Sequence, residues 1–208
     1  MRVPIAREGW GFILVPAAAA ALLGAAGWWE AAVGFAAAAL AFAGFFRDPD
    51  RVPPERPGAF LAPADGKVME VRELVDPYVG EAVRVSIFLS PLDVHVNRSP
   101  VAGLVTDVER RPGRFLAAYR SRASETNERC TVALQGEATR VTVRQVAGFL
   151  ARRIVCRART GDKLEAGERF GMIRFGSRTD LTMPRQTVLR VKPGDRVRGG
   201  ESVIGVLR

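Results

Sequence analysis

Apolar and polar residues alternate along most of the chain after residue 58, and this alternation constrains the fold more than any other feature. Short segments in which every second residue is apolar predict strands with one buried face. We expect such strands at residues 67–74, 82–89, 101–108, 130–134 and 139–146. Two other segments, residues 115–119 and 149–156, are candidates for helical turns. The body of the protein is therefore expected to be mainly β, within an α+β chain.

The N-terminal part differs, because it consists of two apolar runs at residues 10–29 and 31–46, separated by Glu30. These runs predict a membrane-associated helical hairpin over residues 1–46. A signal peptide is excluded, since the apolar part is too long and a second run follows. Each run is near the lower limit of about 20 residues for a spanning helix, so spanning twice and dipping into one leaflet are both open. A soluble alanine-rich hairpin is the alternative, although soluble helices normally present a polar face.

Basic residues flank both ends of the hairpin, namely Arg2, Arg7, Arg47 and Arg51. Positive flanks favour the cytoplasmic side, so we expect the protein at the cytoplasmic face of the cell membrane. Residues 47–58 contain four prolines. Proline disfavours helix interiors and central strands, so this segment is expected to be a linker, followed by a catalytic β domain over residues 59–208.

An internal repeat marks the C-terminal third, where residues 161–168 resemble residues 194–201. Each copy has Gly-Asp at one turn and Gly-Glu at the next, and a short apolar segment follows. Two such units resemble the β-sandwich of lipoyl and biotinyl carrier domains, with residues 63–68 as a further strand. One candidate function is therefore a membrane-tethered carrier-like or adaptor β domain without catalysis. A carrier needs a lysine at the tip between its two halves, and residues 175–185 contain none.

The formal net charge of +9 favours anionic partners. Nucleic acid is not expected, because no recognition helix or aromatic platform accompanies the charge. A basic segment is either attracted to an anionic membrane surface or is a solvated loop. Its arginines are Arg110, Arg111, Arg114, Arg120 and Arg122.

The two cysteines, Cys130 and Cys156, have no CxxC spacing, and His95 is the only histidine. A metal site is therefore not expected, and two buried thiols are the preferred interpretation.

The dipeptide Gly176-Ser177 is either an ordinary turn between strands or a self-cleavage site. Glycine leaves its carbonyl carbon open to attack, and the Ser177 hydroxyl can reach that carbon through a five-membered ring. The resulting ester can eliminate, which converts Ser177 first to dehydroalanine and then to a pyruvoyl group. Such a step needs a strained backbone and a base that removes the serine proton.

A second motif surrounds the single histidine. Alternation places Asp93, His95 and Asn97 on one face of a strand, while valines occupy the other face. This polar strip is either structural or part of a catalytic site. A third motif contains Asp65-Gly66, which is also common in plain turns. We take Ser177, His95, Asp65 and Asp93 as the candidate catalytic residues.

Together these motifs resemble the phosphatidylserine decarboxylase proenzymes, in the short form of this pyruvoyl-dependent family found in bacteria and archaea. The resemblance extends over nearly the whole chain and rests on the order and spacing of its motifs. They lie at residues 46–49, 63–68, 90–98, 112–116, 124–129 and 175–178. The family also explains the apolar N-terminus, because an enzyme acting on a soluble amino acid has no need of an anchor.

The resemblance implies a lyase that converts phosphatidylserine to phosphatidylethanolamine in phospholipid biosynthesis. The zymogen would cut itself between Gly176 and Ser177 into a β chain, residues 1–176, and an α chain, residues 177–208. Ser177 would become the covalent pyruvoyl cofactor that forms a Schiff base with the substrate. The two chains would stay together as a heterodimer, or as a dimer of such heterodimers.

The family also implies roles for Asp65 and His95 in self-processing and catalysis, with His95 as the acid that reprotonates the product. Longer members have a second histidine three residues after the first, where this chain has Arg98. If a serine–histidine–aspartate triad drives processing here, it can only be Ser177, His95 and Asp65. Candidates for headgroup binding are Asn97, Arg98, Arg114 and Asn127.

Overall fold

The computed structural model describes residues 3–116, 123–148, 153–174 and 177–208. The chain divides into two compact units, Met1–Asp50 and Arg51–Arg208. The boundary between them lies inside the proline-rich segment 47–58, which the structure describes throughout and which contains no helix or strand.

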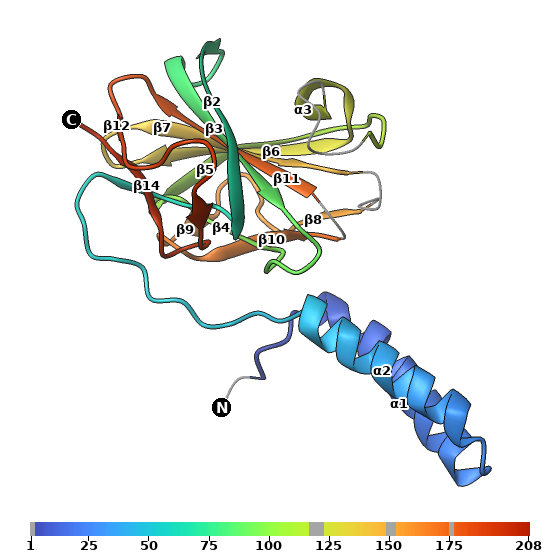
Figure 1. Ribbon diagram of the computed structural model, residues 1–208. Coiled ribbons are helices and arrows are strands. Elements are labelled where there is room, and N and C mark those ends of the chain that lie inside the picture. The colour runs from blue at the N-terminus through green and yellow to red at the C-terminus, as the bar shows by residue number, and fades with distance from the viewer. Residues whose placement is uncertain (1–2, 117–122, 149–152, 175–176) are drawn as a thin grey trace. The chain divides into compact units, whose positions relative to one another are not determined.

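The first unit is a pair of helices that run side by side, α1 (Trp10–Ala25) and α2 (Trp29–Phe45), preceded by the short turn η1 (Arg7–Gly9) (Figure 1). Both helices are rich in alanine, the strongest helix former. Gly27 ends α1 with a φ of 82°, a conformation that glycine adopts without steric cost. The expected N-terminal helical hairpin is therefore confirmed as a structural element.

The surface of this helical pair is apolar to an unusual degree. Many of its large side chains are exposed, among them Leu14, Val15, Leu22, Trp28, Trp29, Val33 and Leu40. The stretch Arg7–Ala25 is long and apolar enough to cross a membrane, and Trp29–Phe45 is shorter. At a rise of about 1.5 Å per residue the two stretches measure about 28 Å and 26 Å, close to the ~30 Å thickness of a hydrocarbon core. Soluble proteins rarely expose so continuous an apolar surface.

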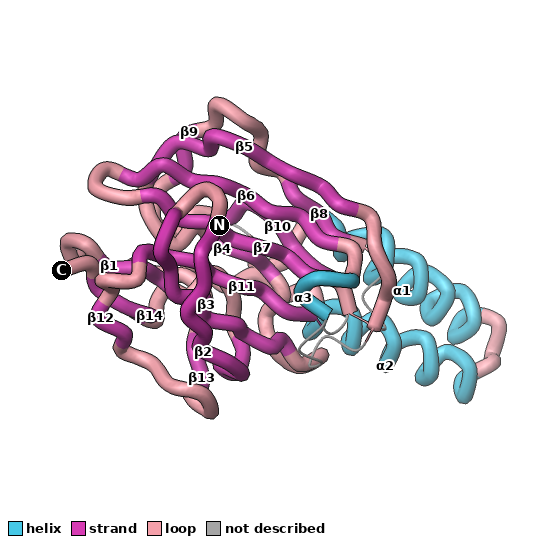
Figure 2. The backbone as a smooth tube through the Cα atoms, turned by 90° about the horizontal axis from the view of Figure 1, so that it is seen from above, coloured by secondary structure: helices cyan, strands magenta, loops and turns pink. Residues whose placement is uncertain are grey.

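The second unit is built from strands and loops, with α3 (Ala123–Thr126) as a short helix (Figure 2). Its main sheet has eight strands, all antiparallel to their neighbours, in the order β13-β2-β3-β11-β7-β6-β5-β9. These strands are β2 (Gly66–Asp76), β3 (Gly80–Leu89), β5 (Gly103–Arg111), β6 (Arg129–Gly136), β7 (Arg140–Val146), β9 (Lys163–Leu164), β11 (Ser177–Pro184) and β13 (Arg196–Val197).

Two smaller sheets complete the body, with the orders β1-β14-β12 and β4-β10-β8. Their strands are β1 (Ala59–Leu61), β4 (Val96–Arg98), β8 (Ile154–Cys156), β10 (Arg169–Ile173), β12 (Val188–Leu189) and β14 (Val203–Val206). The hydrophobic core takes side chains from all three sheets, including Val85, Val143, Ile173 and Ile204. The mainly β architecture expected from the alternating pattern is thus confirmed.

The body is internally duplicated. The two halves of the main sheet have equivalent strand orders when each is followed from its edge to the centre. These orders are β13-β2-β3-β11 and β9-β5-β6-β7. The small sheets match in the same way, β1-β14-β12 with β4-β10-β8. The carbonyl of Asp162 accepts from the amide of Val105 at 2.8 Å, and that of Asp195 accepts from Val68 at 2.9 Å. The repeat in the C-terminal third is therefore part of a larger pseudo-twofold.

One half of this duplication is inserted into the other. Strands β4 to β10 are continuous in sequence, whereas the matching half is formed by β1 to β3 and then by β11 to β14. The chain therefore leaves the first half after β3, completes the second half, and returns to the first at the start of β11. Ser177 is the first residue of that returning strand.

The local predictions have mixed outcomes. The expected strands coincide with parts of β2, β3, β5, β6 and β7. The helical turn expected at residues 149–156 is wrong where the structure describes it, because Ile154–Cys156 is the strand β8 paired with β10. Its short apolar run has no clear period, and pairing with a neighbouring strand decided its conformation. The other expected turn, residues 115–119, falls largely outside the described residues.

Candidate active site

Ser177 is the first residue of the central strand β11 and is paired with Leu89 of β3. Every residue of β11 is buried, and Ser177 itself is 0% exposed. Its Oγ is buried and has no hydrogen-bond partner in the part of the chain that the structure describes. An orphaned hydroxyl in a protein interior is costly and calls for an explanation, which a chemical role would provide. Gly176 lies outside the described residues.

A chain of buried amides joins the strand of the single histidine to β11. The Nδ2 of Asn97 donates to Oγ1 of Thr179 at 3.2 Å, and the Nε2 of Gln145 donates to Oδ1 of Asn97 at 2.8 Å. Thr179 and Gln145 are directly opposite each other on β11 and β7, and Thr179 shares a face with Ser177. This network fixes β4 against the same face of β11 that carries the Ser177 hydroxyl. The Oε1 of Gln145 is also buried without a partner.

His95 directly precedes β4 and is fully buried. Its Nδ1 lies 2.9 Å from the carbonyl of Asp93, and its own carbonyl accepts from the amide of Ile173 at 3.2 Å. The Asp93 carboxylate accepts from the amide of Ser90 at 2.8 Å and lies 3.4 Å from Arg196. Asp93 therefore orients His95 through its backbone, while its side chain stabilises the turn before β4.

Asp65 and Arg98 both contact the turn that contains Gly199 and Gly200. The Asp65 carboxylate accepts from the amide of Gly199 at 2.7 Å and from Arg51 at 2.9 Å. Arg98 is nearly fully buried, and its Nη1 donates to the carbonyl of Gly167 at 3.1 Å. A side chain on Gly200 would collide with Arg98, since an added Cβ would lie 2.8 Å from its Cδ. The residue that replaces the second histidine of the longer relatives is thus packed beside the turn that holds Asp65.

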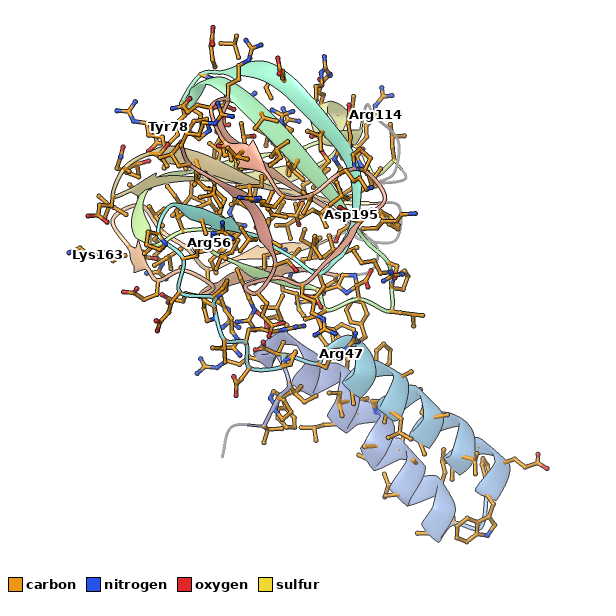
Figure 3. The ribbon with its side chains drawn as sticks, turned by 60° about the vertical axis from the view of Figure 1, so that its left-hand side comes forward. Arg47, Arg56, Tyr78, Arg114, Lys163 and Asp195 are labelled. Atoms are coloured by element: carbon orange, nitrogen blue, oxygen red, sulfur yellow. The ribbon has the colours of Figure 1, made fainter. Side chains whose placement is uncertain are left out.

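The candidate headgroup residues Arg114 and Asn127 lie at the base of one loop. Asn127 is fully buried, donating to the carbonyls of Leu116 and Ala147 and accepting from the amide of Leu116. These bonds use both of its amide hydrogens, so its side chain holds the loop together. Arg114 is exposed and points away from the body of the protein (Figure 3). The rest of the basic segment, Arg120 and Arg122, lies outside the described residues.

The opposite face of β11 carries a buried ionic network. The Nε of Arg178 donates to Asp180 at 2.6 Å, and its Nη2 donates to Ser86 at 2.6 Å and lies 3.6 Å from Glu70. Asp180 also accepts a hydrogen bond from Ser124 of α3. Arg84 lies nearby, and its burial lowers the pKa of its guanidinium, an effect that Asp180 opposes and Arg144 strengthens.

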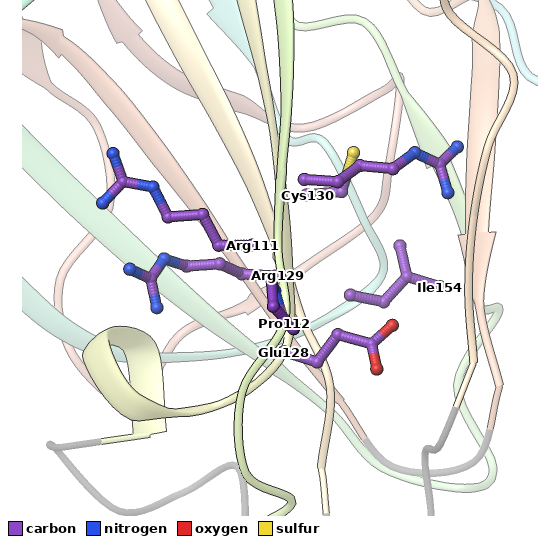
Figure 4. A pocket seen from close by; sticks show the side chains of 7 residues that line it. Arg111, Pro112, Glu128, Arg129, Cys130 and Ile154 are labelled. Carbon is purple, nitrogen blue, oxygen red and sulfur yellow. The ribbon is translucent and has the colours of Figure 1, made fainter.

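Both cysteines are buried thiols, as expected. They contact each other, and the hydrogen bond between them, together with burial, raises the pKa of Cys130. Accepting that bond lowers the pKa of Cys156. Cys130 lines a pocket of about 240 Å³ with Arg110, Arg111 and Arg129. In Figure 4, Arg111 and Arg129 extend to one side of the strands and Ile154 to the other.

From the sequence, Gly176-Ser177 was either an ordinary turn between strands or a self-cleavage site. Ser177 begins a central strand and is buried, because the second half of the duplication is inserted at this point. Gln145, Thr179, Arg178 and Asp180 were missed. A signal was present, since polar residues occupy positions of strong strands where the pattern calls for apolar ones.

The chain has clear relatives. The family model described as phosphatidylserine decarboxylase matches residues 38–205. A protein of Symbiobacterium thermophilum named phosphatidylserine decarboxylase proenzyme is 51% identical, over 100% of this chain and 98% of its own length. Proteins with the same name from Nocardia farcinica and Desulfotalea psychrophila are 48% and 44% identical; each match covers 98% of this chain, with 88% and 97% of the relative covered. This chain therefore belongs to the phosphatidylserine decarboxylase family of enzymes.

Proposed function

We propose that this protein decarboxylates phosphatidylserine to phosphatidylethanolamine with a pyruvoyl group that it makes from its own Ser177. The observation that carries the proposal is the Ser177 hydroxyl, which is fully buried, lacks a hydrogen-bond partner and begins a central strand. A hydroxyl without competing partners is free to attack the neighbouring carbonyl carbon. Ser177 therefore fits a pyruvoyl group made by self-cleavage, which the word proenzyme in the names of the relatives suggests.

Self-cleavage needs no external reactant except water. The Ser177 Oγ bonds to the carbonyl carbon of Gly176, the C–N bond between the two residues breaks, and the hydroxyl proton ends on the new amine. Elimination from the ester releases Gly176 as a carboxylate and leaves a double bond in residue 177. Water then replaces the nitrogen, which leaves as ammonia, and a ketone remains. This ketone would supply the electron sink for loss of CO₂.

The protein's own residues would hold and protonate the reacting groups. His95 is our candidate for the group that moves protons, because it is the only histidine and is fully buried. Asn97, two residues further along the polar strip, bonds to Thr179, two residues beyond Ser177. The amide chain from Gln145 through Asn97 to Thr179 would thus keep β4 and β11 in register while protons move. Asp65 would take part in self-processing from the turn of Gly199, where Arg51 and the amide of Gly199 hold its carboxylate.

Cleavage would leave a stable heterodimer. The α chain, residues 177–208, contributes β11, β12, β13 and β14. Strand β11 pairs along its length with β3 on one side and, over residues 178–182, with β7 on the other, and both belong to residues 1–176. A central strand satisfies its backbone groups on both sides, so its release would expose two rows of unpaired groups. We therefore expect the two chains to stay associated without a covalent link.

The helical pair would anchor the enzyme to the membrane that contains its substrate. Its exposed apolar side chains and basic flanks support this role. Deleting residues 1–46 should move the protein from the membrane fraction to the soluble fraction. Retention of the truncated protein on vesicles would show that the basic surface, and not the helices, is the anchor.

Intact mass spectrometry of the purified full chain tests the central claim. The proposal requires two chains, with the smaller one beginning at residue 177 and lacking the mass of a free serine N-terminus. Edman degradation of that chain should be blocked. An active enzyme that consists of one uncleaved chain would refute the pyruvoyl mechanism.

A further inference from the structure

Arg178 is a buried cation with unused hydrogen-bonding capacity. Arg178 is 2% exposed, and its Nη1 has no hydrogen-bond partner among the described residues. Guanidinium carries five N–H donors, and a buried donor of a charged group that lacks an acceptor is costly. Asp180 and Ser86 occupy Nε and Nη2, so they hold the planar group in one orientation. The remaining nitrogen thus has no acceptor among the described residues and is available to one from a ligand.

Arg178 is also the centre of a row of cations across the main sheet. Directly opposed residues connect Lys67 to Phe88, Phe88 to Arg178, Arg178 to Val146, Val146 to Arg129, and Arg129 to Arg111. Opposed residues in antiparallel strands share a face, so these six side chains lie on one face. We call the four cations among them, Lys67, Arg178, Arg129 and Arg111, the basic row. Along β11, the row crosses the sheet at Arg178, one residue after Ser177.

Two hollows are lined by residues at the two ends of the basic row. One, of about 350 Å³, is lined by Lys67, Met69 and Phe88, the residue opposite Arg178. The other is the 240 Å³ pocket that contains Arg111 and Arg129 (Figure 4). The Arg111 charge is shared with Glu109 at 2.6 Å, and Arg129 donates to the carbonyl of Glu125 at 2.6 Å. Each end of the basic row therefore combines space with positive charge.

We propose that Arg178 binds an oxyanion of the substrate headgroup, through Nη1, and so positions the lipid at residue 177. This inference rests on the proposed function, because it takes residue 177 to be the reacting group. The carboxylate and phosphate of a serine phospholipid are both a few bonds from its amine. The side chains of residues 177 and 178 lie on opposite faces of β11. After the proposed cleavage, residue 177 is a chain end, because no residue precedes it. A ligand bound there can therefore also reach the face that carries Arg178. A planar guanidinium fixed by two partners suits either oxyanion.

The test compares Arg178→Lys and Arg178→Gln with the wild type, as full chains in nonionic detergent. Arg185→Gln is the matched control, since Arg185 follows the same strand but is exposed and paired with Glu73 at 2.8 Å. Cleavage is followed by denaturing gel, and kcat and KM are measured with phosphatidylserine in mixed micelles. We expect the cleaved Arg178 variants to show KM raised roughly 10- to 100-fold with little change in kcat, and the control to be unchanged.

Inhibition by small anions identifies the group that is bound. Glycerophosphoserine carries both oxyanions, glycerophosphoethanolamine lacks the carboxylate, and inorganic phosphate is the free anion. Competition by all three that weakens in the Arg178 variants supports a phosphate contact. Competition by glycerophosphoserine alone, again dependent on Arg178, supports a carboxylate contact. A KM and an inhibition profile equal to the wild type in a cleaved variant would overturn the proposal and leave Arg178 a structural role.

A second measurement covers variants that fail to cleave. Glycerophosphoserine binding is measured by calorimetry on the uncleaved Ser177→Ala protein, with and without Arg178→Lys. Weaker binding in the double variant supports the proposal, and equal binding contradicts it. This readout is independent of the pyruvoyl group, so a wild type that does not cleave would refute the proposed function without deciding the role of Arg178.

Discussion

Strands β7 and β11 occupy matched places in the duplicated sheet, but they begin in opposite ways. β7 follows β6 through the short turn at residues 137–139, and its first residue, Arg140, is exposed. β11 follows β3 only after a whole half of the body, and its first residue, Ser177, is buried. The same topological position is thus a surface turn in one half and an interior site in the other.

This difference shows how a chain can be cut in its core without falling apart. A break near the β6–β7 turn would lie in solvent, where no other element holds the backbone. A break before β11 lies where β3 and β7 pair with the strand and the buried amides of Asn97 and Gln145 pack against it. Insertion of one half into the other therefore creates a place where tertiary contacts can strain and then retain one peptide bond.

The largest effect is expected from Ser177→Ala, which removes the nucleophile. The variant should remain a single chain and have no decarboxylase activity, as measured by denaturing gel and by release of labelled CO₂. Thr139→Ala in the β6–β7 turn, one residue before the matched position Arg140, is the control and should cleave normally. Decarboxylation by the uncut Ser177→Ala protein would contradict the special role of the start of β11.

His95→Asn should come next in size. Loss of a general acid or base typically costs about 10²- to 10⁴-fold in rate, so we expect a fall of this order in kcat, in cleavage, or in both. Separate time courses of cleavage and of CO₂ release distinguish the two steps. Wild-type rates for both would exclude His95 as the proton carrier.

A moderate effect is expected for Asn97→Leu, which removes the buried hydrogen bonds of Asn97 with Thr179 and Gln145. We expect the free energy of unfolding in urea to fall by about 1–3 kcal/mol and cleavage to slow. The corresponding control in the other half is Gln135→Leu, next to the β6–β7 turn, where the partners are partly exposed. If both variants lose equal stability and cleave equally fast, the buried network has no special role at β11.

The smallest effect is expected for Arg140→Ala, at the exposed start of β7. The Arg140 guanidinium lies 5.3 Å from the ring centre of Tyr78 and also donates to Gln135 at 3.1 Å. Exposed contacts of this kind contribute about 0.5–1 kcal/mol. We expect a stability loss within that range and normal cleavage. A block of cleavage by this substitution would mean that the two strand starts are coupled.

Local patterns in the sequence predicted several features well. Runs of alanine and other apolar residues predicted the helical pair, and alternation predicted the main strands. The Gly-Asp and Gly-Glu turns of the repeat adopt the positive φ values expected at Gly161, Gly167, Gly194 and Gly200. These features depend on neighbours in sequence, so short windows are sufficient to detect them.

The candidate site was predictable only in part. Ser177, His95 and Asn97 were identified from motifs, and the structure brings the strand of Asn97 onto β11. Arg51 at Asp65 and Gln145 at Asn97 were not predicted, because each pair joins separate segments whose register cannot be read from one chain. The Arg178–Asp180 pair was missed although its spacing of two residues places both side chains on one face of a strand. The short segment at residues 154–156 shows the same limit, since only β10 made it a strand.

The sequence by itself determined the local chemistry of this protein: an apolar helical pair, a β body and one glycine–serine bond suited to acyl transfer. Only the tertiary structure decided that this serine begins a buried central strand, that its hydroxyl has no partner, and that a cation with an unused donor lies beside it. The physical reason is that strand pairing and burial depend on residues far apart in the chain. Local propensity selects the elements, whereas their pairing determines which polar groups are left without partners and so available for function.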